Sequence, residues 1–155
     1  MLNPRVPPHS EEAEKSVIGA ILLDSEAIVK VAEFLRPEHF YDPSHQSIYA
    51  AELSLYEERS PIDLVTVSDK LKKLKQLKES GGSDYLAKLV GNVPTAANVL
   101  SYAKLVKDCF TKRELVRLSG EMSTSAMDEG REVVEILDEA EQKIFSLSQQ
   151  QMRQG

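Results

Sequence analysis

The longest stretch without a helix-breaking residue lies in the second half of the chain, after Pro94. Residues 95–127 contain no proline, which allows one helix of about 30 residues, or about 45 Å at 1.5 Å per residue. A domain of about 100 residues has a radius of gyration of only ~13 Å, so we expect such a helix to protrude from the compact part. Gly120 and the run Ser123-Thr124-Ser125 weaken the helix and leave a break open there.

A second helical pattern follows a turn that we predict at residues 128–130. Its apolar residues, between residues 132 and 148, step alternately by four and three, which is the heptad spacing of a helix that packs along another helix. We therefore predict an antiparallel helical hairpin over residues 95–148. The residues expected to form its packed seam and interface are Val133, Leu137, Ala140, Ile144 and Leu147, with Leu118 and Met122 on the first helix.

The apolar seam of this hairpin is also the candidate self-association surface. Five apolar side chains at about 1.5–3 kcal/mol each would contribute about 8–15 kcal/mol if they were fully buried. Doubled across a two-fold axis, this is enough to exceed the roughly 4–15 kcal/mol cost of association. The alternative is that the seam packs only against the first hairpin helix. We expect the seam both to pack against the first hairpin helix and to contact a second subunit.

Residues 1–94 are predicted to form a compact head made of several shorter helices. Prolines 4, 7 and 8 keep the lead-in extended, Pro37 ends the second helix, and Gly81-Gly82 is a loop. The predicted caps or first residues of the head helices are Ser10, Ser25, Ser44, Thr66 or Ser68, and Asp84. The polar tail at residues 149–155 is expected to start a flexible linker. The fold class is therefore all-α, with a multi-helix head followed by the hairpin.

The composition argues against secretion and membrane insertion. The single cysteine, Cys109, permits no disulfide framework and no cysteine-based zinc site, which fits a reducing cytoplasm. The first ten residues lack the features of a signal peptide, and no apolar run approaches the ~18 residues of a membrane span. We expect a cytoplasmic protein that has no membrane partner.

The charge balance also limits the function classes. With 19 basic and 25 acidic residues, the formal net charge is −6, opposite to the electrostatic footprint of an autonomous nucleic-acid binder. The one basic cluster consists of Lys70, Lys72, Lys73, Lys75 and Lys78. We interpret it as a solvated helix face, with weak contact to an acidic partner as the sharper alternative.

No motif in the chain predicts catalysis or cofactor binding. A phosphate-binding glycine loop is absent, since Gly81-Gly82 has no suitably placed lysine after it. His39, Asp42 and His45 are possible metal ligands, but they surround a predicted turn, so local capping or packing is the favoured interpretation. Cys109 is expected to be a small buried hydrophobic residue, because no neighbouring histidine supports a nucleophile. We assign no catalytic, cofactor-binding or metal residue.

An ordered set of short motifs resembles the DnaB family of bacterial replicative helicases. The set comprises Pro7-Pro8, EAEKSVIGA at residues 12–20, Leu35 with PEHFY at 37–41 and His45, PIDLVT at 61–66, Gly81-Gly82 with Tyr85-Leu86, and PTAAN at 94–98 with Tyr102-Ala103. Each motif alone is weak evidence for the resemblance, but together the motifs span most of residues 7–115. After Arg113 the resemblance is to a pattern of helices rather than to specific residues.

The resemblance implies a non-catalytic N-terminal domain that assembles subunits and docks partners. Its hairpins would pair subunits so that three dimers form a collar on a hexameric ring, and the hairpin region would meet primase, with a helicase loader as a further candidate partner. In that family the ATPase, with its ATP and Mg²⁺, belongs to a RecA-like C-terminal domain that these residues lack. The chain alone would then neither hydrolyse ATP nor unwind DNA, and DNA would be contacted only through the full-length hexamer.

Two other function classes remain as alternatives. A stand-alone DNA-binding or protein-interaction helical module is the second, and the acidic balance argues against its DNA-binding form. A small enzyme is the third, and the absence of an activated nucleophile argues against it. The sequence alone does not fix the oligomeric state or the surface that meets primase.

Overall fold

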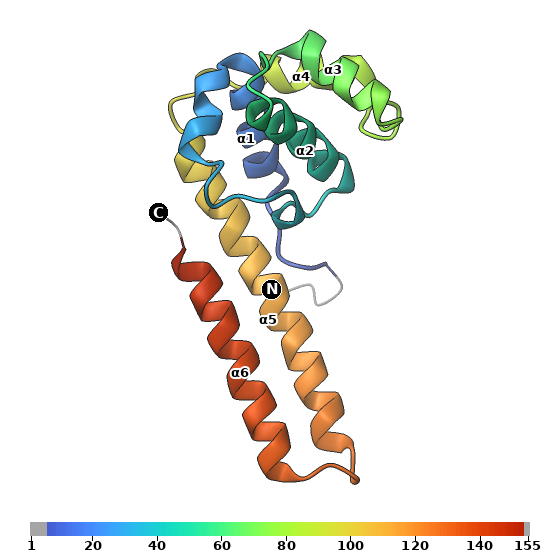
Figure 1. Cartoon of the computed structure of the whole chain (residues 1–155), viewed down its shortest axis with the longest axis vertical. Helices are drawn as coiled ribbons and strands as arrows, with labels where there is room; N and C mark the ends of the chain where they lie inside the picture. The colour runs from blue at the N-terminus through green and yellow to red at the C-terminus, as the bar shows by residue number, and fades with distance from the viewer. Residues whose placement is uncertain (1–5, 154–155) are drawn as a thin grey trace. The chain divides into compact units, whose positions relative to one another are not determined.

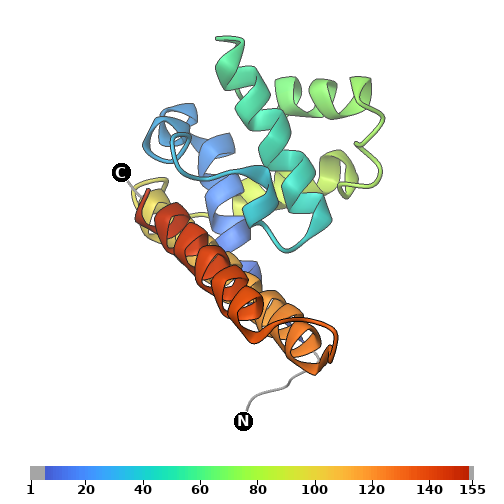
Figure 2. The same ribbon diagram turned by 60° about the horizontal axis from the view of Figure 1, so that its bottom comes forward.

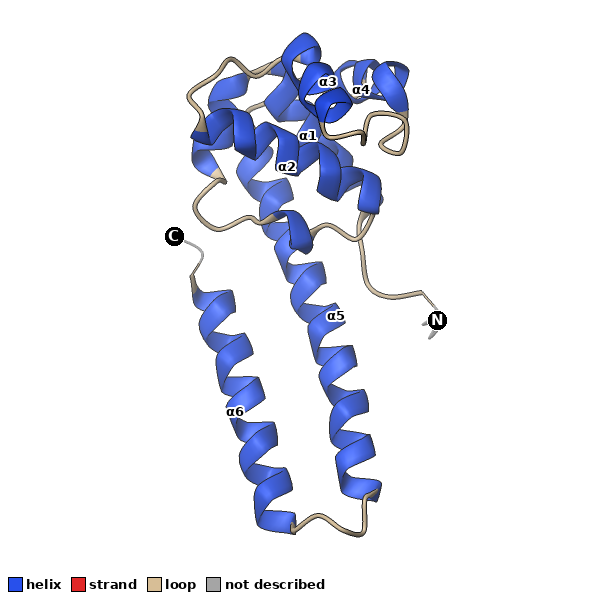
Figure 3. Ribbon diagram, turned by 45° about the vertical axis from the view of Figure 1, so that its right-hand side comes forward, coloured by secondary structure: helices blue, strands red, loops and turns tan. Residues whose placement is uncertain are grey.

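The computed structural model describes residues 6–153 and contains only helices, turns and loops in that range (Figures 1 and 3). In chain order the elements are α1 (Glu11–Leu23), the 3₁₀ helices η1 (Ser25–Lys30) and η2 (Pro37–His39), α2 (Pro43–Glu57), α3 (Leu64–Lys73), α4 (Gly82–Gly91), α5 (Val99–Met127) and α6 (Val133–Met152). The predicted all-α class is confirmed. The chain divides into two compact units, which we call the head (residues 9–107) and the hairpin unit (residues 108–153 with 6–8).

The core of the head is built around α1. One face of α1 is buried, including Val17 and Ile21, which have no exposed surface. Gly19 lies against α4, because a Cβ atom there would come within 2.6 Å of the Leu89 carbonyl oxygen and 2.7 Å of Val93 Cγ2. Only glycine allows the two helices to approach this closely, so the glycine is needed for α1–α4 packing.

A buried polar chain links three helices of the head. The Glu14 carboxylate on α1 accepts the backbone N–H groups of Tyr41, at 2.7 Å, and Asp42, at 3.3 Å, and lies 2.8 Å from Nδ1 of His45. The other ring nitrogen of His45 lies 2.6 Å from the Tyr85 hydroxyl on α4. Burial is the main cause that raises the pKa of Tyr85 to about 12. His45 therefore connects α1 and α4 through partners 31 and 40 positions away in the sequence, and does not cap or pack locally as the sequence predicted.

The head differs from the sequence prediction around residues 25–43. Residues 25–30 form a 3₁₀ helix that Asp24 caps through the Glu26 amide, and Pro37 begins η2 instead of ending a longer helix. His39 stabilises that start, because its Nδ1 accepts the backbone N–H of Arg36 at 2.9 Å. The apolar residues of this segment are spaced as in an α-helix, but the chain forms successive short turns there instead.

Two predicted helix caps were wrong by a few residues. Asp42, not Ser44, caps α2 by accepting the Ser44 amide at 2.8 Å, with Pro43 in the first turn. Asp63 caps α3 in a reciprocal capping box with Thr66, in which Asp63 Oδ1 accepts the Thr66 amide and Thr66 Oγ1 accepts the Asp63 amide, both at 2.9 Å. In both cases the aspartate precedes the predicted residue and its carboxylate accepts the amide hydrogen bond.

The hairpin unit consists of the later part of α5 and the whole of α6, which run antiparallel and side by side (Figures 1 and 2). α5 continues through Gly120 without a break, so the possible interruption there does not occur. α6 extends to Met152, past residue 148 where we had ended the hairpin, so residues 149–152 are helical instead of starting a linker. The boundary between the two compact units falls at residue 108, inside α5, instead of at residue 95.

Candidate interface on the helical hairpin

Contacts between α5 and α6 run along the length of the hairpin. Near the end of α6, Gln151 accepts a hydrogen bond from Thr111 at 2.5 Å and donates one to Asp108 at 2.7 Å. Near the turn, Arg131 donates to the Ser125 hydroxyl at 3.0 Å. Polar side chains therefore hold much of a seam for which the sequence pattern predicted apolar contacts only.

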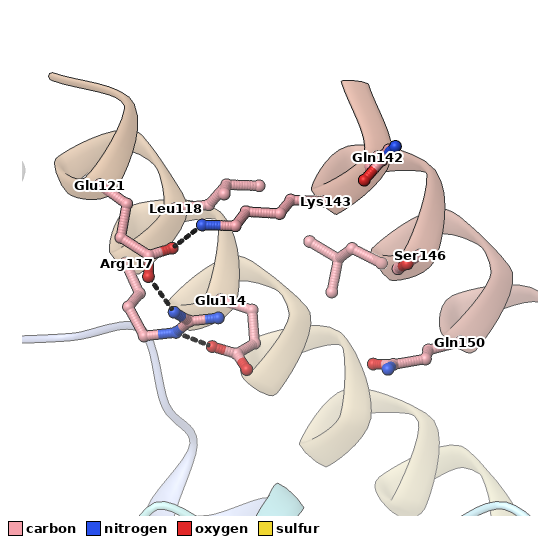
Figure 4. Close-up of a pocket in the computed structure, with 9 residues that line it drawn as sticks. Glu114, Arg117, Leu118, Glu121, Gln142, Lys143, Ser146 and Gln150 are labelled. Carbon is pink, nitrogen blue, oxygen red and sulfur yellow. Dashed lines mark hydrogen bonds and ion pairs between the residues drawn. The ribbon is translucent and has the colours of Figure 1, made fainter. Parts of the chain in front are cut away.

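One flank of the seam is closed by a chain of ion pairs (Figure 4). Arg117 contacts Glu114 at 2.7 Å and Glu121 at 3.1 Å within α5, and Glu121 contacts Lys143 of α6 at 3.4 Å. Lys143 also pairs with Glu139 at 2.9 Å. We call this flank the polar face of the hairpin.

Charge pairing on the polar face shifts the pKa values of its members. The Glu139 pKa is lowered, first by the hydrogen bond from Lys143 and then by that from Arg131. The pKa values of Arg131 and Lys143 are raised, in each case chiefly by the hydrogen bond to Glu139. All three groups thus hold their charged forms more firmly, but their side chains are still 30–39% exposed, and such partly solvated pairs contribute little to stability.

The polar face contains a cavity of about 340 Å³, shown with its side chains in Figure 4. Its lining residues are Glu114, Arg117, Leu118, Glu121, Gln142, Lys143, Ser146, Leu147 and Gln150. Gln142, Ser146 and Gln150 line it from α6, and Glu114, Arg117 and Glu121 line it from α5. The cavity thus presents charges of both signs with amide and hydroxyl groups, and its floor holds only two aliphatic side chains.

The opposite flank of the hairpin carries exposed apolar side chains. Each residue advances about 100° around a helix with 3.6 residues per turn, so Leu115 lies on the side of Leu118 that faces away from Glu114 and Glu121. In an antiparallel pair the corresponding flank of α6 carries Leu137 and Ile144. Leu115, Leu137 and Ile144 are 47%, 57% and 44% exposed. We call this flank, made of Leu115, Val133, Leu137 and Ile144 with half-buried Met122, the apolar face.

The predicted seam residues therefore separate into two groups. Leu118 is buried and Met122, Ala140 and Leu147 are half-buried, so these four lie at or beside the α5–α6 contact. Val133, Leu137 and Ile144 are exposed on the apolar face instead. The heptad count placed them in the seam because it could not tell which of two adjacent stripes of α6 faces α5.

Several residues of the hairpin were not found by the sequence pattern. Ile136, Glu139 and Lys143 are half-buried on the inner side of α6, where the heptad count had placed other residues. Val134 and Phe145, which are 66% and 64% exposed, lie at the outer edge of α6. Cys109, expected to be buried, is only half-buried. The three-and-four spacing of Ile136, Glu139, Ala140 and Lys143 is a signal that could have found this stripe, although its two charged residues make it weaker.

Metal-ligand clusters and membrane-spanning helices are both absent from the described residues. Residues 6–153 contain no group of three or more histidine, cysteine or acidic side chains placed to hold a metal ion. No helix in the same range is both long enough and apolar enough to cross a membrane. The hairpin faces are therefore the surface features on which we base the functional argument.

The sequence matches the family model described as DnaB-like helicase N terminal domain over residues 6–108. It is 42% identical over 149 residues to the replicative DNA helicase DnaB of Geobacillus stearothermophilus, and 41% identical over 149 residues to the replicative DNA helicase DnaC of Bacillus subtilis strain 168. Each match covers 96% of this chain but 33% of the relative. The chain thus spans about a third of the length of these relatives.

Solved structures give the same result. The N-terminal domain of DnaB helicase from Mycobacterium tuberculosis superimposes with a TM-score of 0.84 at 40% identity, covering 91% of this chain and 99% of that one. A structure of the N-terminal domain of DnaB helicase from Helicobacter pylori and its interactions with primase gives a TM-score of 0.64 at 29% identity, covering 75% of this chain and 90% of that one. This chain therefore belongs to the DnaB-like helicase N-terminal domain family, within the replicative DNA helicases.

Proposed function

We propose that this chain is the non-catalytic assembly and docking domain of a replicative DNA helicase that works in the cytoplasm. It pairs with a second copy through the apolar face of the hairpin, and such pairs form the collar of a hexamer. It also docks primase. The observation that carries this proposal is the cluster of exposed aliphatic side chains on one hairpin flank, since charged residues cover the other.

Self-association through the apolar face follows from the cost of leaving it in water. Leu115, Leu137 and Ile144 are each close to half exposed, although they belong to residue types that are usually buried. Exposed apolar side chains gathered on one flank are typical of a protein interface. An isologous contact places the same stripe of both copies together, so each residue is used twice.

Primase docking is supported by the similarity to the N-terminal domain of the Helicobacter pylori helicase, whose structure is described together with its interactions with primase. The polar face is our candidate surface, because its cavity offers amide and hydroxyl groups between balanced charges. If the apolar face is covered in a pair, the polar face still has its donors and acceptors available. A helicase loader is a further candidate partner of the same domain.

ATP hydrolysis and DNA unwinding belong, in this proposal, to the part of the helicase that these residues do not include. The parent protein would be an ATP-dependent helicase that uses Mg²⁺, and this chain would contact DNA only as part of the hexamer. The formal net charge of −6 supports this division, since phosphate binding favours basic surfaces.

The test compares two substitutions on α6 that add the same charge to opposite flanks. Leu137→Asp places a carboxylate on the apolar face, and Gln142→Asp places one on the polar face. Sedimentation velocity over a protein concentration series should show weaker pairing for Leu137→Asp and unchanged pairing for Gln142→Asp, because an unpaired charge resists desolvation. Circular dichroism checks that both variants remain folded.

The two variants also separate assembly from docking. A titration with primase should retain binding by Leu137→Asp and weaken it for Gln142→Asp. Equal pairing of Leu137→Asp and the unchanged chain at every concentration would contradict the assembly proposal. Full primase binding by Gln142→Asp, together with its loss in Leu137→Asp, would move the docking surface to the apolar face.

A further inference from the structure

The end of α3 displays lysines that have no charge partner in the structure. Lys70 pairs with Glu58 and Lys73 pairs with Asp69, but no ion pair or hydrogen bond involves the side chains of Lys72, Lys75 or Lys78 within residues 6–153. These three lysines are exposed, and Leu74 between them is 52% exposed. We call Lys72, Leu74, Lys75 and Lys78 the lysine turn.

The backbone of the lysine turn is held by hydrogen bonds and includes an unusual conformation. Lys75 has a φ of 59°, in the left-handed region that glycine most often occupies at the end of a helix. Its N–H donates to the Lys72 carbonyl at 3.0 Å, and the next N–H, of Gln76, donates to the Leu71 carbonyl at 2.8 Å. A lysine therefore stands where glycine would suit the backbone better, which suggests that its side chain has a use.

The loop between α5 and α6 has the opposite character. Around the turn, Asp128, Glu129, Glu132 and Glu135 are exposed, while Arg131 is paired with Glu139. Met127 and Val134, which are not part of the apolar face, are 80% and 66% exposed in the same segment. We call residues 127–135 the hairpin tip, an acidic segment interleaved with exposed apolar side chains.

We propose that the hairpin tip of one copy binds the lysine turn of a second copy. The two surfaces are complementary in charge, and each also has exposed apolar side chains that the contact would cover. Since two different surfaces meet, the contact is heterologous and can continue from copy to copy until a ring closes. It would thus join pairs formed through the apolar face, and in that respect the inference rests on the proposed function.

Pairing through the apolar face would favour this second contact. Once copies are held together, the exposed tip and lysine turn of neighbouring copies are present at a high effective concentration. The contact between them should depend on salt, because exposed charges are screened over about 10 Å at 0.1 M ionic strength. Pairing through Leu137 and Ile144 should depend on salt much less, so the two contacts can be distinguished in solution.

The experiment is a charge exchange followed by sedimentation velocity at about 50 mM and about 500 mM salt. One variant carries Lys72→Glu, Lys75→Glu and Lys78→Glu, and the second carries Glu129→Lys, Glu132→Lys and Glu135→Lys. We expect each to weaken the species larger than a pair by about tenfold or more at low salt while the pair remains. A chain with all six changes should recover most of that association.

A matched control separates local contact from overall repulsion. Lys30→Glu, Lys88→Glu and Lys104→Glu change three other exposed lysines, and they lower the formal net charge from −6 to −12 as the lysine-turn variant does, because each change contributes −2. The control should associate like the unchanged chain. Equal weakening by the control, failure of the six-fold variant to recover, or no species larger than a pair in the unchanged chain at low salt would each overturn the inference.

Failure of the apolar-face proposal would be seen separately. In that case Leu137→Asp leaves the pair intact at both salt concentrations, whatever the charge-exchange variants do. Circular dichroism and thermal unfolding of every variant check that the loss of larger species is not a loss of folding. The inference is supported only by loss in both triple variants and recovery in the combined one.

Discussion

The head and the hairpin unit use their apolar residues in opposite ways. Nearly every buried hydrophobic side chain lies in the head, between Ala13 and Val106, whereas Leu118 is the one in the described part of the hairpin unit. α6 buries none of its residues fully, although it carries Val133, Leu137, Ile144 and Phe145. The head thus buries most of its apolar side chains, although Val65 and Leu74 stay exposed, whereas the hairpin unit leaves most of its own exposed.

The largest expected effect comes from deleting a core side chain of the head. Ile48 is completely buried in α2, so Ile48→Ala should lower the free energy of unfolding by about 2–5 kcal/mol. Leu137→Ala on the apolar face should change it by about 0.5 kcal/mol or less when measured on dilute, unpaired protein. Urea unfolding of both variants checks the contrast, and a loss at Leu137 equal to that at Ile48 would show that the hairpin face is part of a core.

The buried polar chain of the head should be nearly as sensitive. Glu14→Ala leaves the amides of Tyr41 and Asp42 and the ring of His45 without their acceptor, so we expect a loss of roughly 3 kcal/mol. Tyr85→Phe removes only the hydroxyl at the outer end of the chain and should cost about 1 kcal/mol. Chemical denaturation measures both, and equal costs would mean that the chain is not anchored at Glu14.

Glu52 is a buried carboxyl of the head that lies outside the Glu14 network. Its carboxyl is fully buried, and neither oxygen has a hydrogen-bond partner. Burial raises its pKa well above the usual value of 4.5. The folded state therefore keeps a proton that the unfolded chain releases above about pH 4.5, and this group's contribution to stability is lost as the pH rises through the raised pKa.

Replacing Glu52 should remove that dependence. Glu52→Leu should raise the free energy of unfolding at neutral pH by about 1–2 kcal/mol, because an unpartnered buried polar group is replaced by an apolar one. Glu52→Gln cannot titrate, so its stability should fall less than that of the unchanged chain between mildly acidic and neutral pH. Thermal unfolding over a pH series measures this difference. A stability that falls equally with pH in Glu52→Gln and in the unchanged chain would contradict the account.

A small stabilising effect is expected at Gly120 in the hairpin. A Cβ at Gly120 would meet nothing within 4 Å outside the local helix, so Gly120→Ala should stabilise α5 by about 0.5–1 kcal/mol through its helix propensity. The same change at Gly19 in the head should destabilise the protein, since the added carbon would collide with α4. Thermal unfolding of the two variants compares an open position with a closely packed one.

The sequence predicted the class of the fold well and the details of its contacts less well. The apolar face of α1, the continuous helical pattern after Pro94 and the antiparallel hairpin follow from local periodicity. The caps at Asp42 and Asp63 were missed because serine and threonine two or three residues later are also good caps. The 3₁₀ segment after Asp24 was missed because three-residue and four-residue spacing look alike over one turn.

The candidate interface could be predicted only in part, for a different physical reason. The heptad spacing of α6 contains two neighbouring stripes, one with Leu137 and Ile144 and one with Ile136, Ala140 and Lys143. Which stripe faces α5 depends on α5, where Glu121 is placed to pair with Lys143. That choice is a property of the packed pair of helices, so it cannot be read from α6 alone.

The central claim, that the apolar face is covered by a second copy, is tested most directly by side-chain footprinting with hydroxyl radicals over a range of protein concentrations. We expect Leu137 and Ile144 to become protected as the concentration rises, while exposed Gln142 on the opposite flank keeps its reactivity. Ile48 should stay protected at every concentration and serves as the internal reference. Reactivity of Leu137 and Ile144 that does not change with concentration would contradict the account.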